Sequence, residues 1–244
     1  MVRWAVITIT LFGAASVPAE MIVIPAGAYT NLFKNEGVVA VASFELDAIP
    51  VTNQEYLDFV TAFPAWRRSN IKSVFADDAY LSHWTDDLTP GPLAPADSPV
   101  VQVSWFAARA FAKSAGKRLP TLAEWELAAR ADESNTVARI LAWYGKPVRG
   151  ALPPIRSTFQ NAFGVWDMHG LVWEWVDDFN TALVTGESRA DVGLERDLFC
   201  GSGALGASSF DDYAAFMRYA FRSSLQARYT VPNLGFRCAR GITP

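Results

Sequence analysis

Cysteine and histidine, the residues best suited to metal or redox chemistry, are scarce in this chain of 244 residues. Two cysteines, Cys200 and Cys238, and two histidines, His83 and His169, are all it has. Two histidines cannot build a histidine-rich zinc or copper site, and the HExxH spacing is missing. An even number of cysteines is consistent with one disulfide in an oxidising compartment. A disulfide or a thiol-based site is therefore the chemistry open to these residues.

Two further patterns match catalytic motifs only weakly. The stretch "GSGALG" at residues 201–206 fits GxGxxG, but no helix pattern follows it and no strand–helix–strand unit encloses it. A triad of Ser202 with a histidine lacks support, because neither histidine has a distinctive context. The sequence alone therefore points to neither a dinucleotide site nor a serine nucleophile.

The least ordinary segment is "NAFGVWDMHGLVWEWVDDF" at residues 161–179. Three tryptophans stand there among acidic residues, a glycine and His169. Carboxylates beside backbone carbonyls suit a hard cation, whereas aromatic rings suit a binding groove or a core. The residue types leave all three interpretations open.

Charge and the N-terminal residues limit the partners and the compartment. A net charge of −4, with no basic cluster longer than "WRR", argues against a nucleic-acid partner. Arg3 precedes an apolar run too short to span a bilayer, and "VPA" then offers small residues for cleavage after Ala19. We therefore predict a signal peptide over residues 1–19 and a periplasmic or secreted domain over 20–244, without membrane insertion after cleavage. The alternative is a buried N-terminal helix or strand.

The elements that must position the site follow from periodicity and capping residues. Apolar runs predict strands over 21–24 and 38–49. Three helices are predicted where Thr52, Ser104 and Thr121 stand as N-caps before helical periodicity. Residues 64–99 predict a packed surface loop, because aromatic residues persist through an irregular, proline-rich stretch. After Asp132 the helix signals fade, so the sequence predicts one α+β domain with much irregular backbone.

Several segments together resemble the formylglycine-generating enzyme (sulfatase-modifying factor) family. They are "MIVIPAGAY", "PVTNQEYLDFV", "PVVQVSWFAARAFAKSAGKRLPTLAEWELAAR", "NAFGVWDMHGLVWEWVDD", "CGSGA" and "NLGFRCAR", in the order expected of that family. The resemblance implies a single domain with a core like that of C-type lectins. The stretch "AWRRSNIKSVFADDAYLSHW" is further similar to the NirV-type proteins found beside copper nitrite reductases.

The resemblance also shows a departure at the catalytic copper. Family members that make formylglycine hold copper with two cysteines shortly after a Gly-Gly-Ser motif. Here Ser202 matches the motif serine, Leu205 takes the place of the first cysteine, and residues 206–222 offer no second one. Because paired thiolates select Cu(I), we expect no copper site and no formylglycine-generating activity.

For the two cysteines, the resemblance leaves three possibilities. Cys238 matches a structural cysteine that is usually bridged, and Cys200 replaces the first motif glycine beside the groove. A Cys200–Cys238 disulfide is the first possibility. A free, groove-facing Cys200 thiol able to bind metal or substrate is the second, and two inert buried thiols are the third.

In the family, the segment at 161–179 wraps a calcium ion. The matching ligands here are Asp167, Gly170, Val172 and Glu174, with backbone and carboxylate oxygens of the kind calcium prefers. The alternative is that Asp167 and Glu174 cap turns or meet arginines.

The substrate groove of the family is matched at four positions, beside the thiol of Cys200: Trp173, Ser202, Arg222 and Asn233. For Trp173 the alternative is core packing. We expect Trp175 in the core, Arg237 in a buried ion pair and His169 as an ordinary hydrogen-bonding residue.

Two functions follow from these expectations. The first is an accessory, maturation or binding factor for a protein partner, such as a periplasmic copper reductase, with the loop at 64–99 as contact surface. The alternative is a metal-dependent oxidoreductase with altered chemistry in the same groove. Carbohydrate binding needs an exposed calcium ion, which the family buries.

Overall fold

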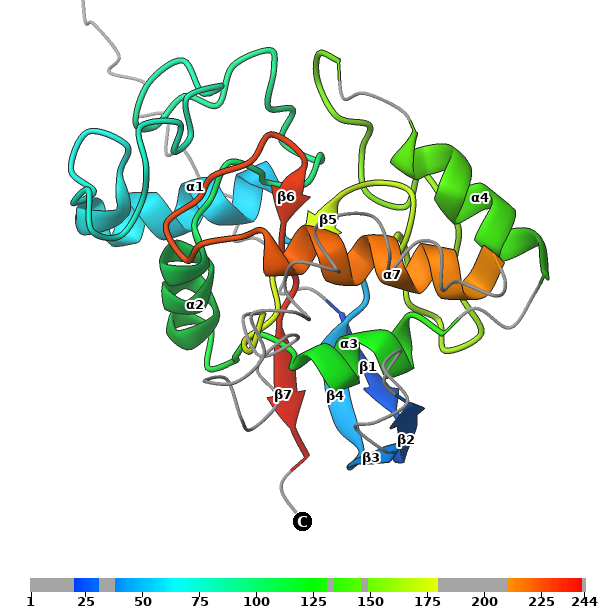
Figure 1. The fold of residues 1–244 in the computed structure, drawn as a ribbon. Coiled ribbons are helices and arrows are strands. Elements are labelled where there is room, and N and C mark those ends of the chain that lie inside the picture. Colours follow the sequence, from blue (N-terminus) through cyan, green and yellow to red (C-terminus); the bar gives the residue numbers. More distant parts are fainter. Residues whose placement is uncertain (1–19, 31–37, 131–133, 146–148, 180–209, 243–244) are drawn as a thin grey trace, which may run out of the picture.

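The structure is a computed structural model that describes residues 20–30, 38–130, 134–145, 149–179 and 210–242. In these segments short strands and helices alternate with long irregular stretches (Figure 1). None of the helices in these segments is long and apolar enough to cross a bilayer.

In the described part of the chain, the strands form three small sheets. The first joins β1 (Met21–Ile24), β4 (Phe44–Asp47) and β7 (Ala239–Gly241), all antiparallel, so the C-terminal strand lies beside the first strands of the domain. The other two sheets pair β2 (Gly27–Thr30) with β3 (Val38–Val41), and β5 (Trp173–Glu174) in parallel with β6 (Leu234–Gly235). The strand predicted over 38–49 is thus two strands, because β3 pairs with β2 whereas β4 pairs with β1.

Three helices begin at the predicted caps: α1 (Asn53–Ala62), α2 (Trp105–Ser114) and α3 (Leu122–Ala128). Thr52 and Glu55 form a complete capping box, since the hydroxyl accepts from the Glu55 amide and the carboxylate accepts from the Thr52 amide. Gly116 follows α2 at φ +68°, a conformation that suits glycine and stops the helix. These local predictions are confirmed.

Two further helices were not predicted: α4 (Ser134–Tyr144) and α7 (Phe210–Ser223). The expectation that helices end near Asp132 is therefore wrong. The buried positions of α7 include Arg222 as well as Ala214 and Tyr219, and this arginine interrupts the apolar stripe that reveals an amphipathic helix. Figure 1 shows α7 running in front of the short strand β5, with α4 at its side.

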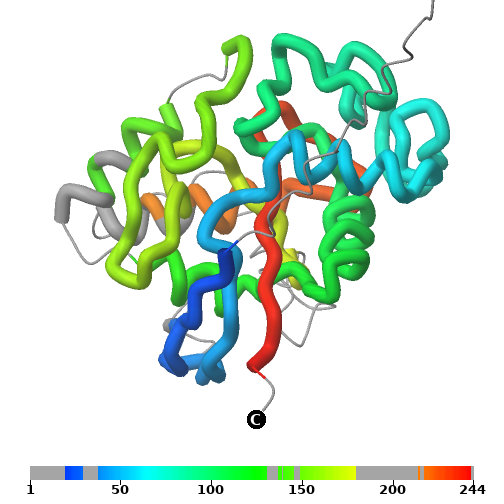
Figure 2. The backbone as a smooth tube through the Cα atoms, turned by 180° about the vertical axis from the view of Figure 1, so that it is seen from behind, coloured from blue at the N-terminus to red at the C-terminus, as the bar shows by residue number. Residues whose placement is uncertain are grey.

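The loop at 64–99, which begins with the short 3-10 helix η2 (Pro64–Trp66), is packed as predicted. Tyr80 and Trp84 are almost fully buried. The Tyr80 hydroxyl lies 2.7 Å from the Tyr56 hydroxyl, and the Trp84 indole N–H donates to Asn53 Oδ1 at 3.2 Å. Figures 1 and 2 place this loop and α2 on the same side of the molecule. We call residues 64–99 the insertion loop.

Candidate functional site

Trp173, predicted to line a groove, is held among aromatic rings. It sits in β5 and stacks on Phe221 of α7 with ring centroids 4.3 Å apart. It also stacks on Tyr144 of α4 at 4.6 Å, with Trp143 at 5.3 Å. The indole is half-buried, and the helices α4 and α7 supply the rings that cover it. Trp173 therefore packs between β5, α4 and α7 with part of its indole exposed, and its role as a groove residue stays a prediction.

Arg222, the second predicted groove residue, is a buried ion-pair partner. Its side chain is 2% exposed, and Nη1 donates to Glu126 Oε1 at 2.7 Å. The guanidinium carbon lies 4.5 Å from the centroid of the Trp125 ring, a cation–π contact. One helical turn earlier on α7, Arg218 donates to both oxygens of the same carboxylate. We call Glu126, Arg218 and Arg222 the arginine–glutamate cluster.

The electrostatics of this cluster favour its charged form. Burial by itself raises the pKa of Glu126, but the charges and hydrogen bonds of Arg218 and Arg222 outweigh it and hold the pKa at about 2. The charge of Arg222 also acts on the carboxyl of Asp178. Within the described residues, Arg222 Nε has no hydrogen-bond partner. Tyr144 lies beside Arg218, and burial raises the pKa of its phenol.

His169 contributes a neutral ring to the same region. Burial lowers its pKa to about 3, and its Nε2 lies 3.1 Å from the Ala129 carbonyl oxygen. Its ring packs edge-on against Trp125 at 5.4 Å. The prediction that His169 is an ordinary hydrogen-bonding residue is confirmed.

Sequence reasoning missed Glu126 and Arg218. The signal for Arg218 is its spacing of four from Arg222, which places both on one face of a helix once α7 is recognised. Glu126 stands in "LAEWELAAR" among apolar residues of α3, and a buried acid in such a stripe requires a cationic partner. Neither signal identifies the partner without the placement of α7.

The predicted calcium ligands have protein hydrogen-bond donors instead. Asp167, fully buried and at φ +58°, accepts from the amides of Arg156 and Thr158 and from the Thr158 hydroxyl. Glu174 accepts from Arg237 through both carboxylate oxygens and from the Trp125 indole at 2.7 Å.

A cation there would face the Arg237 guanidinium, so the carboxylates as arranged do not fit calcium. Asp167 caps a turn and Glu174 pairs with an arginine, which are the contacts of the alternative that the sequence left open, and calcium binding stays a prediction. Gly170 and Val172 lie in the same segment. Across the described residues, no three side chains of His, Cys, Asp or Glu gather closely enough to hold a metal ion. Arg237 and Trp175 are buried as predicted.

The remaining site residues are placed only in part. Asn233 is half-buried, and its carbonyl accepts from the Trp173 amide at 2.8 Å, which brings these two predicted residues together at the β5–β6 pair. Cys200 and Ser202 lie outside the described residues. Cys238 is fully buried and is a free thiol among the described residues. The pairing of Cys238 with Cys200 stays a prediction that a thiol count can test.

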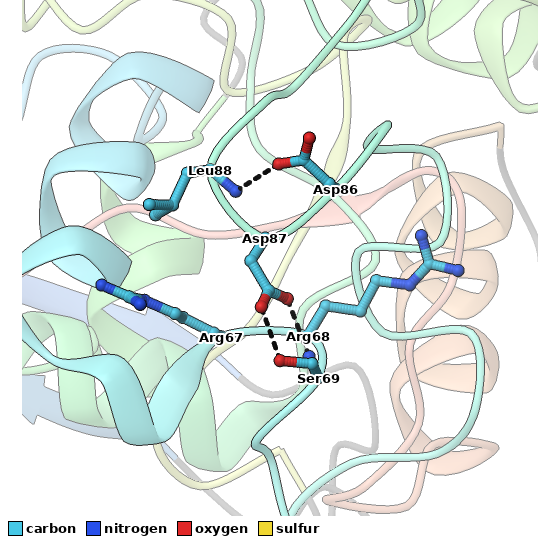
Figure 3. A pocket seen from close by; sticks show the side chains of 6 residues that line it. All are labelled: Arg67, Arg68, Ser69, Asp86, Asp87 and Leu88. Carbon is cyan, nitrogen blue, oxygen red and sulfur yellow. Dashed lines mark hydrogen bonds between the residues drawn. The ribbon is translucent and has the colours of Figure 1, made fainter.

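The insertion loop carries an open polar pocket of its own, about 570 Å³ in volume (Figure 3). Asp87 lies at its centre and accepts from the amide and hydroxyl of Ser69, and the hydroxyl bond lowers the pKa of the carboxyl. Arg67 and Arg68 point to opposite sides of Asp87 in Figure 3, and both donate to backbone carbonyls. These bonds fix the loop and leave Leu88 exposed at the rim.

Comparison with known proteins places the chain in a family. The model of the sulfatase-modifying factor enzyme 1-like domain matches residues 10–242. The chain belongs to the sulfatase-modifying factor family. It is 34% identical over 193 residues to the formylglycine-generating enzyme of Streptomyces coelicolor, an alignment that covers 65% of this chain and 58% of that enzyme's length.

Two other relatives of the family complete the comparison. The chain is 28% identical over 256 residues to the inactive C-alpha-formylglycine-generating enzyme 2 of Bos taurus, covering 83% of this chain and 79% of that protein. The solved structure of PvdO from Pseudomonas aeruginosa superposes with a TM-score of 0.54 at 21% identity, over 92% of this chain and 95% of the other. These matches confirm the predicted fold, a single mixed α and β domain of this family.

Proposed function

We propose that this member of the family is an accessory or binding factor for a protein partner and does not oxidise cysteine to formylglycine. The observation that carries the proposal is the state of its thiols. The sequence holds two cysteines, and Cys238 is fully buried. At most one thiol, that of Cys200, is left for a copper ion that needs a pair.

The surroundings of Cys238 keep its thiol unreactive. Burial, and then the charge of Asp47, raise the pKa of the thiol well above its ordinary value. The Cys238 amide donates to Asp47 Oδ2 at 3.0 Å, and Asp47 in turn pairs with Lys117. A thiol that stays protonated is a poor ligand for copper and a poor nucleophile.

The region predicted as groove also supports a role other than oxidation. Trp173 is covered by rings from α4 and α7, and Arg222 is engaged by Glu126. Within the described residues, Arg222 therefore has little surface to offer a substrate, and Trp173 is half-buried.

The insertion loop supports binding of a partner. Of the nine large apolar side chains that are exposed among the described residues, five lie on or beside this loop: Phe63, Val74, Phe75, Leu88 and Leu93. Exposed apolar side chains gathered on one segment mark an interaction surface. We further propose that residues 1–19 direct export, and that the partner is a periplasmic copper enzyme of the nitrite reductase type.

An activity assay tests the first half of the proposal. The purified chain is supplied with Cu(I), dioxygen and a cysteine-containing peptide, and mass spectrometry follows the peptide, with the Streptomyces coelicolor enzyme as positive control. We expect aldehyde from the control only. Aldehyde formed by this chain would overturn the proposal. A redox metal bound through Cys200, lost in Cys200→Ser, would favour the alternative of an oxidoreductase with altered chemistry.

A capture experiment tests the second half. A tagged chain is co-expressed with the copper reductase, and the retained reductase is quantified. Val74→Asp with Leu93→Asp, both on the insertion loop, should abolish retention. Val23→Asp with Val38→Asp, equally exposed but on β1 and β3, should leave it unchanged. Equal retention by the two double variants would show that the insertion loop is not the contact surface.

A further inference from the structure

A second recognition feature lies on the outer face of α2, outside the predicted groove. It is a pocket of about 480 Å³ lined chiefly by Trp105, Phe106, Arg109, Lys113, Lys117 and Arg118, which we call the α2 pocket. Trp105, Arg109 and Lys113 are spaced by four residues and therefore form one stripe along the helix. Lys117 and Arg118 complete the wall just after Gly116 ends α2.

Three of the four cations of the α2 pocket are paired with carboxylates. Arg109 pairs with Asp177 at 3.1 Å, Arg118 with Glu124 at 2.6 Å, and Lys117 with the buried Asp47. Lys113 is exposed and belongs to no ion pair among the described residues. Lys113 is therefore the one cation of the pocket without an ion pair in the described part of the chain. Glu55 adds a further acidic charge near Lys117.

Two of the paired cations, Arg109 and Arg118, keep much of their surface open. The side chains of Arg109 and Arg118 are 53% and 41% exposed, whereas that of Glu124 is 12% exposed. The Glu124 carboxylate therefore contacts the buried side of the Arg118 guanidinium and leaves the other side open to solvent. A guanidinium has five N–H donors, so one ion pair leaves donors for a second carboxylate.

Aromatic rings join the α2 pocket to the insertion loop. The Arg109 guanidinium lies 4.5 Å from the centroid of the Trp105 ring. Phe106 packs edge-on against Trp105 at 5.4 Å and against Phe75 of the insertion loop at 5.5 Å. Phe75 is itself one of the exposed apolar side chains of that loop. A partner that covers the insertion loop would therefore reach the α2 pocket without a gap.

We propose that the α2 pocket binds an acidic peptide segment of the partner protein, with carboxylates on Arg109, Lys113 and Arg118 and an apolar side chain on Phe106. The inference rests on the proposed accessory role, since it names the chemistry that the partner presents. A peptide is favoured over nucleic acid because Phe106 contacts Phe75, which joins the pocket to the exposed apolar side chains of the insertion loop.

A binding titration with a defined probe tests the proposal. Fluorescein-labelled hexaglutamate is titrated with the full chain at low ionic strength and followed by fluorescence anisotropy, with hexaglutamine and a hexanucleotide of single-stranded DNA as comparison probes. We expect saturable binding of hexaglutamate only, weakening as salt is raised. Tighter binding of the nucleotide, or no preference for hexaglutamate over hexaglutamine, would overturn the proposal.

A matched pair of variants locates the binding. Arg109→Gln with Lys113→Gln should raise the dissociation constant for hexaglutamate about tenfold, as expected for two exposed charge contacts. The control variant, Arg130→Gln with Arg149→Gln, removes the same amount of charge from exposed positions outside the pocket. It should change the dissociation constant for hexaglutamate less than about twofold. Equal weakening by both pairs would show nonspecific attraction and refute the site.

The outcomes also separate this inference from the proposed function. A wild-type chain that retains the reductase but ignores hexaglutamate would refute the α2 pocket and leave the accessory role standing. A chain that makes aldehyde yet binds hexaglutamate through Arg109 and Lys113 would refute the accessory role and leave the pocket. Circular dichroism and thermal unfolding of each variant confirm that it is folded.

Discussion

The arginine–glutamate cluster and the α2 pocket are built from the same parts. Each sets an arginine 4.5 Å from a tryptophan ring, Arg222 at Trp125 and Arg109 at Trp105. Each pairs an arginine with a glutamate of α3. They differ in burial, because Arg222 is 2% exposed and Arg109 is 53% exposed.

That difference decides what each region can do. In the cluster the charges are withdrawn from water and satisfy one another, so they stabilise the position of α7 and are poorly placed to meet a substrate. At the α2 pocket the same groups keep open faces and gain little from their own pairs, so they remain available to a partner. The comparison thus fits the proposed binding role, with Arg222 stabilising the packing of α7.

Removing one acid from each region gives the largest expected contrast. Glu126→Gln leaves two buried guanidiniums without a counter-charge and should lower the free energy of unfolding by about 3–5 kcal/mol. Glu124→Gln keeps the capping interaction at Thr121 and loses only a partly exposed ion pair. This variant should therefore lower the free energy of unfolding by about 1 kcal/mol. Urea denaturation measures both. Equal losses would mean that burial does not distinguish the regions.

Acid should reveal the same cluster in the wild-type chain. The folded-state pKa of Glu126 is about 2 against an ordinary value of 4.5. Because the pKa of Glu126 is lower in the folded state than in the unfolded state, its ion pairs stabilise the fold fully at pH values above 4.5. This stabilisation is lost as the pH falls from 4.5 toward 2. This contribution amounts to about 3 kcal/mol.

Chemical denaturation at several pH values between 2 and 6 checks this. The free-energy difference between the protein with Glu126 and the Glu126→Gln variant should shrink as pH falls through that window. His169, whose pKa burial lowers to about 3, also interacts with the charge of Glu126, so both proteins carry His169→Gln in this comparison. A difference independent of pH would contradict the charged form of Glu126.

Trp173 tests whether the former groove is now packed. Trp173→Ala removes the ring that stacks on Tyr144 and Phe221 and should lower the free energy of unfolding by about 2 kcal/mol, less than for a fully buried tryptophan. Trp173→Phe should recover part of the loss. Retention of the partner should not change in either variant. Lost retention with unchanged stability would instead identify Trp173 as a binding residue.

A chelator should have the smallest effect. Asp167 and Glu174 take protein donors, so EDTA should shift the thermal midpoint by less than about 1 °C. Magnesium-saturated EDTA is the matched control. The calcium site that the family resemblance implied would be supported by a fall of several degrees in the thermal midpoint with EDTA. Calcium would have to reverse this fall, and Glu174→Gln would have to abolish it.

The sequence predicted the structural features that depend on residues close together along the chain. The starts of three helices were predicted from their N-cap residues, Thr52, Ser104 and Thr121, because an N-cap side chain accepts hydrogen bonds from amides two or three residues further along the chain. The family motifs identified Trp173 and Arg222 as residues of interest. Their burial could not be predicted, because it depends on where α7 packs, and the apolar pattern of α7 is broken by the arginines that hold it there.

Copper affinity tests the central claim most directly. The purified, reduced chain is titrated against a coloured Cu(I) chelator, with Cys200→Ser as the matched variant and the Streptomyces coelicolor enzyme as the positive control. The account predicts that the chelator keeps its copper in the presence of this chain and of the variant. One Cu(I) withdrawn per chain, and lost in Cys200→Ser, would contradict it.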